Sequence, residues 1–386
     1  MTPAARVAAA IEVLDDILSG QTAEKALTGW GRAHRFAGSK DRAAIRDHVF
    51  QALRCRASYA WLGGADTGRG IMLGAMRSAG LANAVFTGEG HAPPPVTDDE
   101  AMRPLAQADR ATRLDCPDWM LPLFEDRFGT QADDVLTTLQ SRAGVFLRVN
   151  TRRCSVPEAL ASLAHDDIDA TAVDGVATAL RVLNNERRVA QSGALAQGWV
   201  EVQDASSQAA IAAADIGAGS RWLDYCAGGG GKALALADHG ADVTAHDIDP
   251  LRMRDLPSRA ARAGVTIAQT DGVALRGAAP FDGVFCDAPC SGSGTWRRTP
   301  EAKWALTPDR LETLTRTQDE VLRAGAAQVK PGGMMIYATC SVFRAENEDR
   351  VAAFLTEQGG FDQTDMCQIA PHSDGDGFFW AHLRKR

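Results

Sequence analysis

The sequence predicts an α/β protein whose C-terminal half forms a doubly wound, mostly parallel sheet, preceded by a small α+β module and an all-helical N-terminal region. Three observations carry this prediction. Apolar residues recur at helical spacing up to residue 86, a proline-rich stretch follows, and strand-like and helix-like segments alternate from about residue 205 onward. The 386 residues suit two or three domains.

Residues 1–86 are predicted to be helical. The first apolar repeat consists of Val7, Ile11, Leu14 and Leu18. Gly20 follows it as a stop signal, and Ser39 is the predicted N-cap of a later helix. The stretch TGEGHAPPPVTDDE then breaks the periodicity with three consecutive prolines and four acids, so residues 87–104 are predicted to be a linker.

Residues 105–200 are predicted to form the α+β module. The stretch GVFLRVN is strand-like, and SVPEALASLA is helix-like, with Ser155 as its cap and Pro157 in its first turn. Short strand-like pieces follow in DATAVDG, TALRVLN and WVEVQD.

Residues 201–386 are predicted to form the doubly wound domain. The strand-like stretches are WLDYC, DVTAHDID, VTIAQTD, FDGVFCDAP, GGMMIYATCS, FDQTD and GFFWAHLRK. Helical patterns lie between most of them, and the longest of these has Thr307 as cap and Pro308 at its first position. This alternation predicts a sheet with helices on both faces.

Composition excludes several classes of protein. No apolar run is long enough to span a bilayer, and acids come too early at the N-terminus for a secretory signal, so we expect a soluble, cytoplasmic protein. The eight cysteines are irregularly spaced and contain no C-x-x-C pair, which argues against a disulfide framework and against zinc. The net charge of −8 disfavours nucleic-acid binding, but local arginine clusters still allow a basic face.

A glycine-rich turn in RWLDYCAGGGGKA separates a predicted strand from a predicted helix. Glycines 228–231 allow a ligand to approach the backbone closely, and the helix N-terminus offers unpaired amides. Asp247 and Asp271 end the next two predicted strands, where acids commonly meet a ribose and an adenine amino group. The turn predicts an adenosine-containing cofactor, and on these grounds alone NAD is also possible.

Two cysteines follow predicted strands, Cys290 in DAPCSGSG and Cys340 in YATCS. Ligands of an open parallel sheet sit at the carboxyl ends of its strands, so both thiols are expected beside the crevice of the glycine turn. A strand end gives a thiolate the polar, partly exposed setting that a nucleophile needs.

These two stretches, followed by ENE at 346–348, resemble the signature of RNA 5-methylcytosine methyltransferases of the Fmu/Sun/Nop (RsmB-type) family. LDYCAGGGGK resembles the cofactor motif of that family, and FLRVNTRR, WVEVQDASSQ and DGFFWAHLRK resemble further stretches of it. The resemblance covers roughly residues 110–386 and implies a class I methyltransferase fold. The helical residues 1–86 resemble a NusB-like domain, which precedes the catalytic part in ribosomal-RNA members.

The resemblance implies transfer of a methyl group from S-adenosylmethionine to C5 of cytosine in RNA. Cys340 would add to C6 as a thiolate, Cys290 would assist the later elimination, and Asp287 would contact the N3/N4 edge of the base. Lys232 would point into the same pocket. The implied cofactor-binding residues are Cys226, Ala227, Gly228, Gly230, Gly231, Lys232, Asp247, Asp271 and Asp287, with no metal.

The sequence departs from the family pattern at two positions of the turn. Gly229 stands where proline is usual, which removes rigidity, and Ala233 stands where threonine is common. Near the cysteines, Trp296 has two interpretations: it stacks on a base, or it packs against the sheet. Arg297 and Arg298 either meet phosphates or form a solvated face.

The implied partner is RNA, with small-subunit ribosomal RNA as first choice and transfer RNA as second, bound by a monomer. FLRVNTRR would hold the RNA backbone, and the helical region would add a second contact. Two alternatives stay open. One is a catalytically idle RNA-binding assembly factor, against which the retained cysteines argue; the other is a nicotinamide-dependent oxidoreductase, which would not need them.

Overall fold

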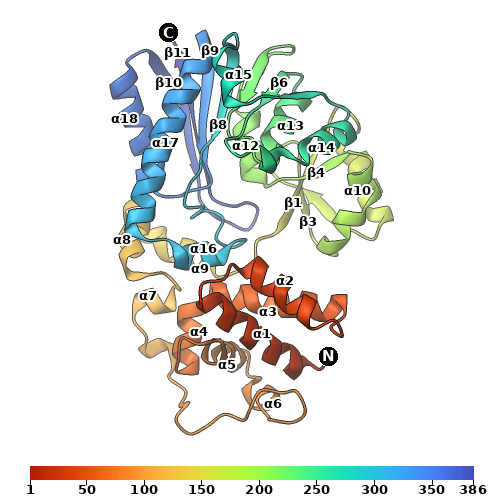
Figure 1. The fold of residues 1–386 in the computed structure, drawn as a ribbon, viewed down its shortest axis with the longest axis vertical. Helices are drawn as coiled ribbons and strands as arrows, with labels where there is room; N and C mark the ends of the chain where they lie inside the picture. The colour runs from red at the N-terminus through yellow and green to blue at the C-terminus, as the bar shows by residue number, and fades with distance from the viewer. The chain divides into compact units, whose positions relative to one another are not determined.

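The computed structural model describes all residues from 1 to 386, and the chain divides into two units (Figure 1). The first consists of Met1–Arg142 and Trp296–Leu306, and the second of Ala143–Thr295 and Thr307–Arg386. The predicted division at residues 86, 104 and 200 is finer than these two units and stays a prediction. None of the helices has an apolar stretch of the length that a membrane span requires.

The first unit contains helices only, which confirms the predicted helical N-terminal region. Its helices are α1 (Pro3–Leu18), α2 (Ala23–Ala33), α3 (Ser39–Arg54), α4 (Arg56–Gly63), α5 (Gly68–Ser78), α6 (Ala82–Val85), η1 (Leu105–Gln107), α7 (Arg110–Arg113), η2 (Asp118–Met120), α8 (Leu121–Phe128), η3 (Gly129–Gln131), α9 (Ala132–Leu139) and α16 (Pro300–Ala305). The prediction of Ser39 as N-cap is wrong: Gly38 is the cap, and the Asp41 carboxylate accepts the Gly38 amide at 3.3 Å.

A short segment from the C-terminal half of the sequence packs within this helical unit. The Trp304 indole of α16 donates to the Leu53 carbonyl at 2.7 Å. Trp296 is 1% exposed, and its ring lies 6.2 Å from that of Phe124. The side chain is therefore packed, as one interpretation predicted, but in the helical unit and not against the sheet, and base stacking is excluded. Arg297 is also buried, so both of its interpretations, a phosphate contact and a solvated face, are wrong.

The second unit begins with a four-stranded antiparallel sheet, in the order β2-β3-β1-β4, that forms the predicted α+β module. Its elements are β1 (Val145–Val149), α10 (Val156–His165), β2 (Ala170–Ala172), β3 (Ala179–Val182), η4 (Glu186–Gln191), α11 (Gly193–Ala196) and β4 (Val200–Val202). Ser155 caps α10 as predicted, in a capping box with Glu158.

The larger sheet has seven strands in the order β10-β11-β9-β8-β5-β6-β7. Its strands are β5 (Arg221–Asp224), β6 (Asp242–Ala245), β7 (Ile267–Gln269), β8 (Phe281–Asp287), β9 (Val329–Thr339), β10 (Phe361–Ile369) and β11 (Phe378–Lys385). Strands β7, β6, β5, β8 and β9 are parallel, and β11 runs antiparallel to both of its neighbours. The predicted doubly wound, mostly parallel sheet is confirmed.

Helices cover both faces of this sheet, as Figure 1 shows. They are α12 (Ala205–Ala212), α13 (Gly231–Asp238), η5 (Pro250–Met253), α14 (Leu256–Ala263), α15 (Gly272–Arg276), α17 (Pro308–Gln328), η6 (Arg344–Glu346) and α18 (Glu348–Gln358). Alternate strand residues divide between two cores because successive side chains point to opposite faces. Trp222 and Phe285 pack with α12–α14, whereas Leu223 and Val284 pack with α17 and α18.

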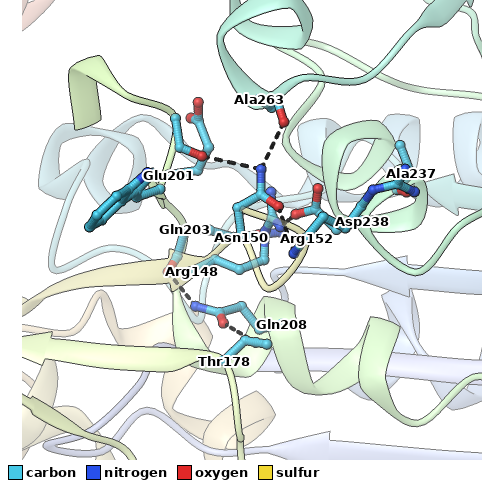
Figure 2. Close-up of polar contacts among 12 residues, drawn as sticks. Arg148, Asn150, Arg152, Thr178, Glu201, Gln203, Gln208, Ala237, Asp238 and Ala263 are labelled. Carbon is cyan, nitrogen blue, oxygen red and sulfur yellow. Dashed lines mark hydrogen bonds and ion pairs between the residues drawn. The ribbon is translucent and has the colours of Figure 1, made fainter. Parts of the chain in front are cut away.

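The stretch FLRVNTRR joins the small sheet to helices α13 and α14, which cover the large sheet (Figure 2). Arg148 is 4% exposed, forms an ion pair with Asp238 of α13, and donates through Nε to Gln203 at 2.7 Å. The Asn150 amide donates to the carbonyls of Gly198 at 3.2 Å and Ala263 at 2.9 Å. The expectation that this stretch holds RNA is therefore wrong for Arg148 and Asn150, whose polar groups are used inside the protein.

We expect Arg148→Ala to lower the free energy of unfolding by about 3–5 kcal/mol, because the Asp238 carboxylate would stay buried without its cation. Urea unfolding monitored by circular dichroism measures the loss. The matched control is the double variant Arg148→Met/Asp238→Leu, which removes both charges and should recover most of the stability. An equal loss in the single and double variants would contradict this explanation.

Candidate active site

The candidate site lies at the carboxyl ends of three adjacent strands of the large sheet. Strands β5, β8 and β9 are neighbours, and they end at Asp224, Asp287 and Thr339. The glycine turn follows β5, the DAPCSGSG loop follows β8, and Cys340 follows β9. The topology alone thus brings together the motifs that the sequence analysis singled out.

The glycine turn is tight, and glycine is required in it. Gly228 and Gly230 have φ values of +51° and +83°, and a Cβ atom on Gly230 would collide with Leu256. The Gly230 amide donates to the Ala227 carbonyl at 2.8 Å, and α13 begins at the next residue. A Cβ on Gly231 would meet no atom within 4 Å, so the first residue of α13 borders open space.

Arg259 restrains the turn at Gly229, the position that lacks the family proline. Its guanidinium donates to the Gly229 carbonyl, and its other nitrogen pairs with the buried Glu201 carboxylate at 3.0 Å. A side-chain contact thereby supplies part of the rigidity that a proline ring would give. Ala233, the second departure, is fully buried in the core against which α13 packs.

The two predicted ribose and adenine acids lie just beyond their strands and not at the strand ends. β6 ends at Ala245, and the buried Asp247 accepts the amides of Gly228 at 2.8 Å and Asp249 at 3.0 Å. β7 ends at Gln269, and Asp271 is the N-cap of α15. Both acids therefore already bind backbone amides, and their cofactor roles stay predictions.

Apolar side chains beside these two acids are exposed. Ile248, which follows Asp247, is 93% exposed, and Val273, two residues after Asp271, is 69% exposed. Sequence reasoning missed both of them because it searched this region for polar groups only.

Lys232 and Asp287 form an ion pair, with Nζ 2.6 Å from Oδ2. Lys232 is the second residue of α13 and Asp287 the last of β8, so the pair joins the cofactor turn to the cysteine loop. Burial disfavours the ammonium charge, but the Asp287 carboxylate outweighs it, and the pKa of Lys232 is raised. Lys232 is thus a cation in the resting site.

The two cysteines are in contact, with the Sγ atoms of Cys290 and Cys340 3.3 Å apart. The hydrogen bond with Cys290 lowers the pKa of Cys340, and the charge of Lys232 lowers it further. Burial and the charge of Asp287 act to raise this pKa, but they do not outweigh the lowering. The same hydrogen bond, together with burial, raises the pKa of Cys290 well above its usual value. The thiolate of the pair therefore belongs to Cys340, and the proton to Cys290.

The remaining cysteines have other surroundings. Cys226 in the turn is half-buried, and burial raises its pKa. Cys286, Cys55, Cys116 and Cys154 are buried. The site thus holds a single pair of contacting thiols.

Asp224, the last residue of β5, is a buried acid that sequence reasoning missed. It is 0% exposed, and neither carboxylate oxygen forms a hydrogen bond within the protein that meets the usual distance and angle. Burial, followed by the charge of Asp287, raises the pKa of Asp224 to about 7. In the sequence, the only indication of a functional role is that Asp224 precedes the glycine turn in WLDYC. This position is equally compatible with the ordinary end of an apolar strand.

We expect Asp224→Asn to change how stability depends on pH. A carboxyl group with a folded-state pKa near 7 and an unfolded value near 4 destabilises the fold increasingly as pH rises between these values. The free energy of unfolding should therefore fall less from pH 5 to pH 8 in the variant than in the wild type, by up to a few kcal/mol, about 1.4 per pKa unit. Urea titrations at each pH measure this difference.

The control for this experiment is Asp242→Asn, which makes the same change of charge at an exposed position of β6. This variant should follow the wild-type dependence. If Asp224→Asn also follows it, the buried carboxyl does not titrate as described.

Glu346 is the second acid that the sequence analysis left without a role, although it noted the ENE stretch. Glu346 in η6 is 0% exposed, and its carboxylate accepts the Ser291 amide at 2.8 Å and the Gln318 side-chain amide at 3.0 Å. Nothing in ENE itself reveals these contacts, because the donors come from distant parts of the chain.

Comparison with known proteins identifies the family. The family model described as 16S rRNA methyltransferase RsmB/F matches residues 213–384, and that of the RsmF/B-like ferredoxin-like domain matches residues 116–190. Ribosomal RNA small subunit methyltransferase B of Enterobacter sp. (strain 638) is 32% identical over 302 residues, which cover 74% of this chain and 70% of that protein. The Salmonella typhi protein of the same name is 33% identical over 285 residues, covering 70% and 66%.

Solved structures share the fold. The crystal structure of PH0851 matches with a TM-score of 0.76 at 22% identity, covering 100% of this chain and 99% of that one. A methyltransferase homologue from Pyrococcus horikoshii matches with a TM-score of 0.63 at 22% identity, covering 72% and 97%.

The fold and the family together define a class I methyltransferase that acts on RNA and uses S-adenosylmethionine as its cofactor. The chain belongs to the RsmB/F family of 16S rRNA methyltransferases. This finding confirms the predicted family, fold and cofactor, and it overturns the nicotinamide-dependent alternative.

The site has groups that fit S-adenosylmethionine. The cofactor carries an ammonium group, ribose hydroxyls and an apolar adenine ring. Asp224 offers a buried carboxylate without a bonded donor, Gly231 borders open space, and Ile248 and Val273 are exposed apolar side chains beside Asp247 and Asp271. An anion for the ammonium group, an open backbone and apolar walls are what such a ligand requires.

Proposed function

We propose that the protein methylates C5 of cytosine in RNA through a covalent bond between Cys340 and C6 of the base. The contact of 3.3 Å between the Cys290 and Cys340 thiols carries this proposal. Beside the thiols lies the ion pair of Lys232 and Asp287, at the carboxyl edge of the same sheet. A thiolate, an adjacent thiol and an acid–base pair in one place suit covalent catalysis on a ring.

Attack by Cys340 prepares the base for methylation. C5 of cytosine is a poor nucleophile. A bond from Sγ of Cys340 to C6 shifts the electrons of the C5–C6 double bond into a C4–C5 double bond, and the electrons of the C4–N3 double bond move to N3, which makes the ring an enamine. N3 takes up a proton, which the Lys232–Asp287 pair supplies, while Asp287 accepts a hydrogen bond from the 4-amino group. C5 then carries the electron pair that takes the new methyl group.

S-adenosylmethionine, when bound, supplies the methyl group from its sulfonium. The residues proposed to hold it are Cys226, Ala227, Gly228, Gly230, Gly231, Lys232, Asp247, Asp271 and Asp287. Of these, the turn residues offer backbone groups, and Asp247 and Asp271 offer carboxylates for the nucleoside.

Elimination then regenerates the enzyme. Solvent water accepts the proton at C5, the electrons of that C–H bond re-form the C5–C6 double bond, and Cys340 leaves as a thiolate. N3 returns its proton to the Lys232–Asp287 pair. Cys290 assists this step, because its thiol lies in contact with the leaving sulfur and binds a proton more tightly than Cys340 does.

The proposed substrate is small-subunit ribosomal RNA, the substrate in the names of the relatives. Its target cytosine must be single-stranded or flipped out, since C5 and C6 are inaccessible to a thiol within a stacked helix. Transfer RNA is the second candidate.

Methylation of purified RNA tests this function. The protein is incubated with small-subunit ribosomal RNA or transfer RNA and with S-adenosylmethionine, and 5-methylcytosine is mapped by bisulfite sequencing. One new protected cytosine in the ribosomal RNA is expected. Methylation of transfer RNA alone would show that transfer RNA is the substrate. Binding of RNA without formation of any 5-methylcytosine would show that the protein is a catalytically idle assembly factor.

A further inference from the structure

Glu346 is a buried anion whose donors are all neutral. Besides Ser291 and Gln318, the hydroxyl of Ser341 donates to it, and that of Ser291 donates at 2.5 Å. None of these contacts removes its charge. A carboxylate that is hydrogen-bonded only to neutral donors keeps its field in the surrounding protein.

The donors to this carboxylate come from both cysteine loops. Ser291 follows Cys290 directly, and Ser341 follows Cys340 directly. The two serine hydroxyls also lie 3.3 Å apart, and the Tyr337 hydroxyl donates to the Glu346 carbonyl at 2.6 Å, which fixes its backbone. One side chain therefore ties together the two loops whose thiols meet.

The charge of Glu346 acts on the two thiols unequally. Behind the hydrogen bond with Cys340, burial and the charge of Cys340, Glu346 is a further cause that raises the pKa of Cys290. Its carboxylate accepts the backbone amide of Ser291, which belongs to the peptide group after Cys290, at 2.8 Å, whereas on the Cys340 loop it accepts only the Ser341 hydroxyl. The anion is thus bonded to the backbone beside Cys290, while the charge of Lys232 favours a thiolate at Cys340.

Other charged or titratable groups around the pair do not reverse this asymmetry. The buried phenol of Tyr337 on β9 is held neutral, because burial and the charge of Glu346 raise its pKa. Asp319 of α17 and Arg350 of α18 form an ion pair at 3.0 Å, so their opposite charges largely cancel at the position of the thiols. Thr295, 3.9 Å from the Cys340 sulfur, is uncharged.

We propose that Glu346 is a positioning residue that makes Cys340, and not Cys290, the thiolate of the cysteine pair. It does so by placing a negative charge beside Cys290, where the Ser291 amide and the Gln318 side chain hold its carboxylate. The proposal rests on the proposed function in one respect, namely that Cys340 is the attacking thiolate.

Alkylation of the two thiols tests this proposal without RNA or cofactor. The full chain is treated with iodoacetamide from pH 6 to pH 9, and the rates at Cys340 and Cys290 are measured by peptide mass spectrometry. In Glu346→Gln we expect the ratio of the Cys340 rate to the Cys290 rate to fall about tenfold, which corresponds to one pKa unit. The pH midpoint for Cys290 should move down.

The double variant Ser291→Ala/Ser341→Ala is the matched control. It removes the hydroxyl contacts but leaves the Glu346 charge, so the ratio should stay at the wild-type value or above, and Glu346→Asp should lie closer to the wild type than Glu346→Gln. A wild-type ratio in folded Glu346→Gln overturns the proposal. If Glu346→Gln does not fold, the double serine variant decides. Loss of the faster alkylation at Cys340 in that variant would overturn the proposed role of the Glu346 charge. Either result leaves intact the role of Cys340 in methyl transfer, which Cys340→Ser tests separately.

Discussion

Cys340→Ser is expected to lose methyl transfer to RNA by at least about 10³-fold, the loss typical of a removed nucleophile. A serine hydroxyl is a far weaker nucleophile at neutral pH. The contacts that favour a thiolate at Cys340 do not suffice to ionise a hydroxyl group. Transfer of labelled methyl groups to ribosomal RNA measures the effect in single-turnover reactions.

The control for this variant is Cys154→Ala, which removes a buried cysteine from the core of the small sheet. It should retain nearly wild-type activity, since that cysteine contacts no residue of the site. If Cys340→Ser were as active as this control, methylation would not proceed through a bond to Cys340.

Cys290→Ala is expected to accumulate a covalent complex between protein and RNA. Attack by Cys340 and methyl transfer do not require the second thiol, whereas elimination of Cys340 does, so the variant should stop after the methyl group has moved. The complex appears as a band of reduced mobility on a denaturing gel, and turnover falls by about 10²-fold or more, as for a lost general acid or base.

The double variant Cys290→Ala/Cys340→Ser should form no such complex, because the attacking thiolate is absent. A band of equal intensity in the double variant would show that another residue bonds to the RNA. Full turnover in the single variant would show that Cys290 has no part in elimination.

The sequence predicts the elements of this fold well where periodicity and strand–helix alternation are strong. The doubly wound sheet, the cap of α10 at Ser155 and the helical N-terminal region all agree with the structure. The pair of cysteines also follows from the sequence, because the carboxyl ends of neighbouring parallel strands meet at one edge whatever the details of packing.

The errors concern residues whose environment depends on distant packing. Arg148 looks like a phosphate-binding arginine in FLRVNTRR, but its partner is Asp238 on a helix some ninety positions further along, and local sequence does not reveal that pair. For the same reason Arg297 was expected at the surface and Trp296 was expected to pack against the sheet, since the helical unit that buries them comes from the other end of the chain.

The two missed acids show a further limit. Asp224 and Glu346 are both fully buried, and a search for exposed reactive groups passes over buried carboxylates. Their significance comes from what surrounds them: Asp224 has no bonded donor, and Glu346 receives donors from both cysteine loops. No motif with a fixed residue spacing predicts either of these environments.

The most direct test of the account uses RNA that contains 5-fluorocytosine at the methylated position. Fluorine at C5 cannot leave as a proton does, so the enzyme should remain bonded to the base after methyl transfer. Digestion and mass spectrometry are then expected to find the nucleotide attached to the peptide that contains Cys340. A nucleotide attached to Cys290, or methylated RNA with no attached peptide, would contradict the mechanism.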